Sequence, residues 1–350
     1  MKKKLKVSIV GAGAIVTQYH LPAILENEES VVTSIVDKNE NRAKQIAEQT
    51  GARYFTSVED VPGADICLVA TPPAVREAVI IPALKKGMNV LCEKPFAYNY
   101  AIAQGLAKAA KEAGKKIFVA QSRRFFPNIH IVRSMLQSGV IHSPLKIALI
   151  EGGAFNWPAV SNHLASENTS DRGIIHDVGS HLVDLLALFL SDLNVDLTEV
   201  KIEQCTVDRL PSVNNCKVKL QWNTAISQGT AVIQMSRTIT LLNKLVVHNP
   251  PMSLITRPLF DKSVRMKLSN GEELMIPLPE KLQYMQSLSD AFSRQWAGVV
   301  HSISNEFNSD EYPSIESHTV LPAIQLLDRI IQYCQVESLD EYFLEGMEKW

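Results

Sequence analysis

The sequence has few cysteines and no pairing motif among them. Its 350 residues include five cysteines, and no two of them stand in a CxxC spacing. A disulfide framework or a structural zinc site needs paired or clustered cysteines, so we expect reduced thiols and no metal site. The cysteines are Cys67, Cys92, Cys205, Cys216 and Cys334.

An excess of one charge and long apolar runs are lacking as well. The net charge is -2 and the pI is near 6.5, whereas binding to nucleic acid or to an anionic membrane relies on clustered basic side chains. No stretch approaches the roughly 18 apolar residues of a membrane span. The apolar stretch at 5–16 is broken by Gly11 and Gly13 and continues into polar residues, unlike a secretory signal. We therefore expect a cytoplasmic protein that binds neither nucleic acid nor a membrane.

The first third of the chain alternates β-branched runs with helical segments. We expect strands at 6–11, 31–37, 65–71, 89–93 and 116–121, separated by helices near 14–26, 39–50, 73–87 and 98–114. This alternation predicts right-handed βαβ units and a doubly wound, parallel α/β sheet of the Rossmann type over residues 1–122.

The pattern changes after about residue 122. A helix near 128–138 is followed by longer strand-like runs, with one helix at 174–190 among them. This order predicts an α+β domain with a mostly antiparallel sheet over 123–350. A final helix is expected at about 314–335, and we leave open whether it packs back toward the first domain. No linker or repeat separates the domains, so we expect a cleft between them.

A glycine-rich turn follows the first expected strand. Gly11 permits a tight turn, and Gly13 lets the backbone approach a pyrophosphate at a helix N-terminus, while Val16 replaces the third glycine of GxGxxG. Asp37 ends the second strand, where a carboxylate accepts hydrogen bonds from a ribose and repels a 2′-phosphate. The pattern favours NAD over NADP, although Lys38 softens the discrimination. The alternative is that Asp37 only caps the next helix.

The stretch NVLCEKPF places Glu93, Lys94 and Pro95 just after the strand at 89–93. This is the carboxyl edge of the sheet, where open α/β sheets bind ligands. A lysine there can donate to a substrate oxygen and stabilise alkoxide charge. The alternative is an exposed lysine at the end of a strand.

Residues 174–184 read IIHDVGSHLVD, an apolar helix with a polar stripe. Asp177, His181 and Asp184 are spaced i, i+4 and i+7, which places them on one side of the helix. Buried polar groups need partners or a cleft. The stripe is consistent with acid/base groups, with a satisfied buried pair, or with metal ligands. A third coherent histidine or cysteine is missing, because His176 points elsewhere, so we expect no metal.

Several of these motifs occur together in one known family. The series GAGAI, ATPP, NVLCEKPF, RRFFP and IIHDVGSHLVD resembles the glucose-fructose oxidoreductase and inositol dehydrogenase family, written Gfo/Idh/MocA. The resemblance continues to the C-terminal YPSIESHTVLPAIQLLDRI. Its most specific parts are EKP at 93–95 and D-x-G-x-H-x-x-D at 177–184.

The resemblance implies a Rossmann domain followed by an open-faced β-sheet domain, whose free face commonly forms homodimers or homotetramers. It implies that Lys94 is the active-site lysine and that Asp177 and His181 are an acid/base pair. Oxidation of a secondary alcohol removes a hydride and a proton, and histidine is the natural base for that proton. With the turn described above, the expected cofactor contacts are Gly11, Gly13, Ala14, Ile15, Asp37, Lys38, Thr71, Pro72, Glu93 and Lys94.

Two departures from the family pattern concern the substrate. The glycine cluster before the D-x-G-x-H run is reduced to Gly173, and the histidine that often follows the T-P motif is Arg76. We hypothesise that Arg172, with Arg123 or Arg124, binds an anionic group such as a sugar phosphate, because a guanidinium matches phosphate geometry.

The expected function is NAD-dependent oxidation or reduction at a secondary hydroxyl of a sugar, cyclitol, sugar phosphate or nucleotide sugar. Asn156 and Trp157 either line the sugar site or pack a loop. Two alternatives stay open: a redox-neutral enzyme that processes glycosides with bound NAD, and a non-catalytic NAD-binding sensor. A sensor would not need Lys94, Asp177 and His181 together.

Overall fold

The computed structural model describes residues 3–154, 173–210 and 213–336. Within these residues the chain divides into two compact units. The first runs from the N-terminal part to Phe125 and resumes at Ser287–Leu321, and the second contains the remainder. The sequence division at 122/123 placed all of 123–350 in the second domain, whereas the structure assigns Ser287–Leu321 to the first unit.

The first unit is built on a six-stranded sheet with the order β3-β2-β1-β4-β5-β6, in which all neighbours are parallel. The central strands are fully buried apolar runs, as expected for parallel strands between two layers of helices. This confirms the Rossmann prediction. The short strand β3, which is mostly exposed, was missed. The strands are β1 (Leu5–Val10), β2 (Ser30–Val36), β3 (Arg53–Phe55), β4 (Ile66–Val69), β5 (Asn89–Glu93) and β6 (Ile117–Ala120).

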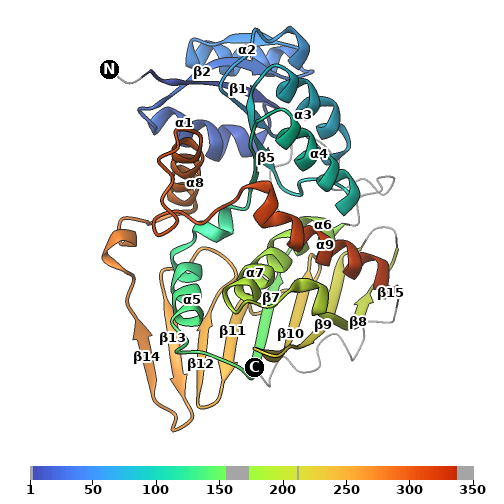
Figure 1. Cartoon of the computed structure of the whole chain (residues 1–350), viewed down its shortest axis with the longest axis vertical. Helices are drawn as coiled ribbons and strands as arrows, with labels where there is room; N and C mark the ends of the chain where they lie inside the picture. Colours follow the sequence, from blue (N-terminus) through green and yellow to red (C-terminus); the bar gives the residue numbers. More distant parts are fainter. Residues whose placement is uncertain (1–2, 155–172, 211–212, 337–350) are drawn as a thin grey trace. The chain divides into compact units, whose positions relative to one another are not determined.

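Helices cover this sheet on both sides (Figure 1). Two helices contact each other on one side, α1 (Leu21–Glu26) and α8 (Leu288–Ile303), and two on the other, α3 (Arg76–Lys85) and α4 (Tyr100–Glu112). The helix α2 (Glu40–Thr50) follows β2. The Asn39 and Asn99 side chains cap α2 and α4 by accepting a backbone N–H bond three residues on.

The helix α8 was not predicted. Its start carries a capping box, in which Ser287 and Asp290 each accept the other's backbone N–H, and this S-x-x-D pattern is the signal that could have revealed it. Nε1 of Trp296 donates to Oγ of Ser30 over 2.9 Å. This contact anchors α8 on the Rossmann sheet, at the start of β2.

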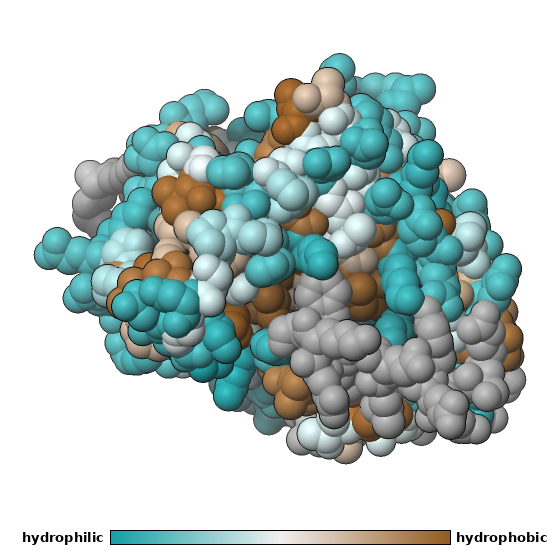
Figure 2. Space-filling model, turned by 90° about the horizontal axis from the view of Figure 1, so that it is seen from below, coloured by the Kyte–Doolittle hydropathy of each residue, from teal (hydrophilic) through white to brown (hydrophobic). Residues whose placement is uncertain are grey.

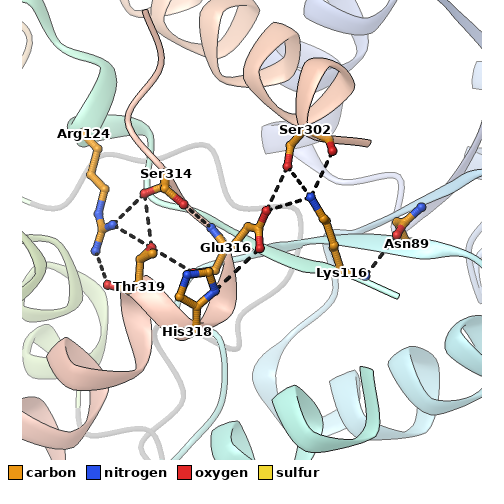
Figure 3. A network of polar contacts seen from close by, with 8 residues as sticks. All are labelled: Asn89, Lys116, Arg124, Ser302, Ser314, Glu316, His318 and Thr319. Carbon is orange, nitrogen blue, oxygen red and sulfur yellow. Dashed lines mark hydrogen bonds and ion pairs between the residues drawn. The ribbon is translucent and has the colours of Figure 1, made fainter. Parts of the chain in front are cut away.

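A polar network fixes the segment before the last helix against the edge strand β6 (Figure 3). Nζ of Lys116 lies 3.0 Å from both Oγ and the carbonyl oxygen of Ser302, and 3.1 Å from Oε1 of Glu316. Ser302 in turn donates to Glu316 over 2.9 Å. The three residues link β6, α8 and the segment that leads into α9 (Ser317–Tyr333).

The second unit is a nine-stranded mixed sheet with the order β14-β13-β12-β11-β7-β10-β9-β8-β15. Neighbouring strands are antiparallel, except that β7 pairs with β10 and β8 with β15 in parallel. The prediction of a mostly antiparallel sheet is therefore confirmed. The strands are β7 (Leu145–Gly152), β8 (Lys201–Val207), β9 (Asn215–Asn223), β10 (Gln228–Ser236), β11 (Lys244–Asn249), β12 (Met252–Thr256), β13 (Val264–Leu268), β14 (Glu273–Ile276) and β15 (Gln335–Val336).

Three helices lie on one face of this sheet, α5 (Pro127–Gln137), α6 (Ile174–Asp177) and α7 (Gly179–Asp192) (Figure 1). Arg133 on α5 makes two bonds of 2.8 Å to the carboxylate of Asp192 at the end of α7, which ties the two helices together. The described residues also contain short helical turns, which lie at Val16–His20, Val58–Asp60, Pro73–Val75, Ser122–Phe125, Leu197–Glu199 and Glu280–Leu282.

Apolar residues on the surface are interspersed with hydrophilic ones (Figure 2). On the face drawn in Figure 2, apolar residues stand in several groups between hydrophilic ones, which is ordinary for a protein surface. Leu274 and Met275 of β14 are more than half exposed. The expected oligomer through this sheet stays a prediction. No helix in the described part of the chain has the length and apolar character needed to cross a membrane.

Candidate functional site

The glycine turn lies where the strand order of the first sheet reverses, between β1 and β4. Gly11 has a φ of +102°, and a Cβ on it would lie 2.6 Å from the carbonyl oxygen of Ala70. Only glycine fits this approach. Its N–H donates to the carbonyl oxygen of Val36 over 2.8 Å. The turn is thus fixed against both neighbouring strands, at the point where doubly wound folds bind dinucleotides.

Asp37 is held beside this turn. Its Oδ2 accepts the backbone N–H of Ala12 and its Oδ1 that of Asn39, each over 2.8 Å. The carboxylate therefore helps to order the chain before α2 and also faces the glycine turn, so the two interpretations of Asp37 are compatible. It is partly exposed, and the neighbouring Lys38 is exposed.

Thr71 brings a buried hydroxyl to the same edge, just after β4. Its Oγ1 is inaccessible to solvent and has no hydrogen-bond partner among the described residues. A buried hydroxyl of this kind needs a ligand or a water to satisfy it. Together with the tight turn at Gly11, it fits a dinucleotide bound across β1 and β4. The remaining expected contacts, Gly13, Ala14, Ile15 and Pro72, are partly or fully exposed, whereas Val16 is buried.

A buried carboxylate supports Lys94. Oε1 of Glu93 lies 2.6 Å from Nε2 of His20, and its Oε2 accepts the backbone N–H of Lys94 over 3.0 Å. Burial alone raises the pKa of Glu93, but His20, Lys94 and Arg76 outweigh it, so the pKa lies below its usual value. No local pattern marks His20, because the carboxylate that it contacts, that of Glu93, lies 73 positions away in the sequence.

Arg76 holds the turn that carries Lys94. It is 4% exposed. Its Nε donates to the carbonyl oxygen of Thr71 over 2.9 Å, and its amino groups donate to those of Glu93, Lys94 and Pro95. One guanidinium with five donors thus joins the turns after β4 and β5. From the sequence, Arg76 stood out only because it replaces the histidine that often follows the T-P motif in the resembled family.

Two glycines allow the helices that carry Asp177 and His181 to pack closely on the sheet of the second unit. Gly173 has a φ of +54°, and a Cβ on it would lie 2.2 Å from the carbonyl oxygen of Val213. At Gly179 a Cβ would lie 3.3 Å from the side chain of Met235 on β10. The single helix expected at 174–190 is instead two, since α6 ends at Asp177 and α7 begins at Gly179.

Asp177 is paired with a residue that the sequence did not indicate. Its Oδ2 lies 2.8 Å from an amino group of Arg237, which directly follows β10, and the side chains are 20% and 11% exposed. The ion pair fixes the orientation of the carboxylate. His181 is partly buried, and Asp184 is only 1% exposed, so the polar stripe runs from the surface into the core. No motif marks Arg237, because it lies 60 residues from Asp177.

Two of the arginines that were expected to bind the substrate, Arg123 and Arg124, are buried. Arg124 donates to the carbonyl oxygen of Ser314 over 2.8 Å and to Oγ1 and the carbonyl oxygen of Thr319 over 3.1 Å each (Figure 3). These contacts give its guanidinium a structural role and do not support a substrate role. Three further candidates lie outside the described residues: Asn156, Trp157 and Arg172.

Comparison with known proteins identifies the family. Residues 5–121 match the model of an oxidoreductase family with an NAD-binding Rossmann fold, Gfo/Idh/MocA. Over these residues the chain belongs to the Gfo/Idh/MocA family. The resemblance of its motifs is thus confirmed.

Two curated relatives have named activities. The chain is 33% identical over 183 residues to an inositol 2-dehydrogenase of Corynebacterium glutamicum, covering 51% of this chain and 53% of that protein. It is 25% identical over 206 residues to a glucose-6-phosphate 3-dehydrogenase of Bacillus subtilis, covering 56% and 57%. The chain spans only 53% to 63% of the length of the first three relatives.

Similarity to a solved structure extends over nearly the whole chain. The 3-ketoreductase KijD10 of Actinomadura kijaniata, in complex with NADP and TDP-benzene, has a TM-score of 0.75, with 95% of this chain and 99% of that chain covered. The sequence identity is 18%, so this likeness shows the shared fold alone.

We expect Arg76→Lys to lower the free energy of unfolding by about 2–4 kcal/mol, because an ammonium cannot bond the four carbonyls that the guanidinium serves. Urea denaturation measures this change. Arg53→Lys, at an exposed arginine on β3 of the same unit, is the control and should change little. Equal effects of the two substitutions would contradict the role of Arg76.

The lowered pKa of Glu93 predicts a pH dependence of stability. The folded protein favours the ionised carboxylate, so its contribution is present above the usual pKa of 4.5 and is lost as pH falls through the lower folded value. Between pH 5 and the acid transition, the unfolding free energy should fall less steeply in Glu93→Gln than in the wild type. The control Glu48→Gln, at an exposed position on α2, should follow the wild type. Parallel curves for Glu93→Gln and wild type would refute the assignment.

Proposed function

We propose that this chain is an NAD(P)-dependent oxidoreductase that transfers a hydride between nicotinamide and a secondary alcohol or ketone of a sugar, cyclitol, sugar phosphate or nucleotide sugar. The proposal depends chiefly on one observation. Gly11, Thr71 and Lys94 follow the three adjacent strands β1, β4 and β5, so the dinucleotide cradle and the reactive lysine share one edge of one sheet. Neighbouring strands are about 4.8 Å apart, which keeps these groups within the length of a dinucleotide.

The residues of this chain handle the oxygen and its proton. NAD(P), when bound at the glycine turn, would supply the nicotinamide that exchanges the hydride with the substrate carbon. The ammonium of Lys94 donates to the reacting oxygen and favours its alkoxide form. His181 accepts the proton of the hydroxyl during oxidation and returns it during reduction. Asp177, oriented by Arg237, positions the imidazole or a substrate hydroxyl. Lys94 belongs to the first unit, and Asp177 and His181 to the second.

The names of the relatives support this reaction class. One acts on inositol and another on glucose 6-phosphate, and both are named as dehydrogenases. A phosphorylated substrate is consistent with the hypothesis that Arg172 binds an anionic group.

Activity is tested by absorbance at 340 nm with NAD and NADP against a panel of sugars, inositols, sugar phosphates and nucleotide sugars. We expect turnover of one substrate class, and a fall in kcat of about 10²–10³ in Lys94→Met, the scale of losing one donor to a developing oxyanion. The control Lys111→Met, at an exposed lysine on α4, should keep wild-type kcat. Absence of turnover across the panel would contradict net oxidation and favour a redox-neutral enzyme or a sensor.

We further propose a preference for NAD over NADP, because the carboxylate of Asp37 is fixed beside the glycine turn and repels a 2′-phosphate. In Asp37→Ser the ratio of kcat/KM for NAD to that for NADP should fall about tenfold or more, equivalent to about 1.4 kcal/mol. Asp65→Ser is a matched control, since Asp65 also accepts a backbone N–H, that of Lys6, but at the opposite end of β1. A ratio unchanged by Asp37→Ser would exclude this residue as the selector.

A further inference from the structure

Three of the five cysteines meet at one point of the second unit, although they are distant in the sequence. Cys205 lies on β8, Cys216 on β9, and Cys334 between α9 and β15. Sγ of Cys205 lies 2.7 Å from Sγ of Cys334 and 4.0 Å from Sγ of Cys216. The three sulfur atoms all lie within 4.8 Å of one another. The absence of a CxxC spacing gave no indication of this cluster.

The position of Cys334 is held from both sides. On the helix before it, Arg329 donates to the carbonyl oxygens of Leu197 and Val200, over 2.9 and 2.5 Å, just ahead of β8. On the strand after it, Gln335 pairs with Thr206 of β8. Because both flanks are tied to β8 and the segment before it, the thiol of Cys334 is kept against that of Cys205.

The three thiols differ in their access to solvent. Cys205 and Cys216 are 2% and 0% exposed, whereas Cys334 is only partly buried. A small oxidant therefore reaches Cys334 first, and the other two sulfurs are available to react with the product.

We propose that Cys334 is an oxidation site that forms a disulfide with Cys205 when the protein meets hydrogen peroxide. The Cys334 thiolate attacks one peroxide oxygen, the O–O bond breaks, and a sulfenic acid and hydroxide form. The Cys205 sulfur then attacks the sulfenic sulfur, the S–O bond breaks, and the leaving oxygen takes the Cys205 proton as water. The hydroxide combines with the proton lost by Cys334. In total, two thiols and one peroxide give one disulfide and two waters.

The geometry favours a sulfur–sulfur bond over a shared metal ion. Two thiolates bound to one zinc ion, each about 2.3 Å from it, lie roughly 3.8 Å apart in a tetrahedral site. The Cys205 and Cys334 sulfurs are closer than this, at 2.7 Å. The third thiol, Cys216, can attack the Cys205 sulfur and exchange the bridge.

The disulfide would fasten the end of α9 and the strand β15 to β8. It would join residues 129 positions apart, and a cross-link that closes a long loop restricts the unfolded chain. Oxidation should therefore raise the melting temperature of the second unit, and reduction should reverse the rise.

The test treats the purified full-length chain with hydrogen peroxide, followed by alkylation and mass spectrometry of non-reduced peptides. We expect a linked Cys205–Cys334 peptide, a loss of two of the five titratable thiols, and a rise in Tm of several degrees that dithiothreitol reverses. Cys334→Ser should abolish all three changes. Cys67→Ser, at a buried thiol on β4 of the first unit, is the control and should keep them.

Three results would overturn the proposal. The first is a wild-type chain that keeps five titratable thiols after peroxide treatment. The second is accumulation of sulfinic acid at Cys334 with no linked peptide. The third is zinc bound in a one-to-one ratio in the untreated protein and released by alkylation of the thiols, which would assign the cluster to a metal.

Discussion

A single close approach of two backbone segments sets the layout of the first unit's site. Gly11 lies against the carbonyl of Ala70 without room for a Cβ, and this contact brings the turns after β1 and β4 together. The same turn places Ala12 where its N–H fixes the carboxylate of Asp37. The hydroxyl of Thr71, which has no hydrogen-bond partner among the described residues, lies at the same edge. The steric freedom of one glycine thus positions the groups that the proposed dinucleotide site requires.

The turn that carries Lys94 is fixed by buried charge instead of by close backbone packing. Arg76 donates to the carbonyl oxygens of Glu93, Lys94 and Pro95. The carboxylate of Glu93 accepts the backbone N–H of Lys94 and also contacts His20. Burial of charged groups is unfavourable unless their hydrogen bonds are satisfied, and here each group has several partners. The lysine therefore extends from a rigid base, as its proposed role of stabilising a developing charge requires.

The features of the structure that depend on residues close together in the sequence were predicted from local patterns. The βαβ alternation, the glycine turn and the D-x-G-x-H run gave the fold and the family, and both are confirmed. The partners of these motifs were not predicted, because His20, Arg76 and Arg237 reach their targets only after folding. The helix α8 had a capping signal that the strand-rich surroundings obscured, and β3 is too short and too exposed to show an apolar pattern.

The most direct measurement is titration of NADH into the purified chain, followed by the fluorescence of the nicotinamide. The account predicts saturable binding of one NADH per chain, abolished in Gly11→Ala, where the new Cβ meets the carbonyl of Ala70. Binding should persist in Gly51→Ala, because that glycine also has a positive φ, +69°, but no atom lies within 4 Å of the added Cβ. A wild-type chain that binds neither NADH nor NADPH, or a Gly11→Ala variant that binds as the wild type does, would contradict the account.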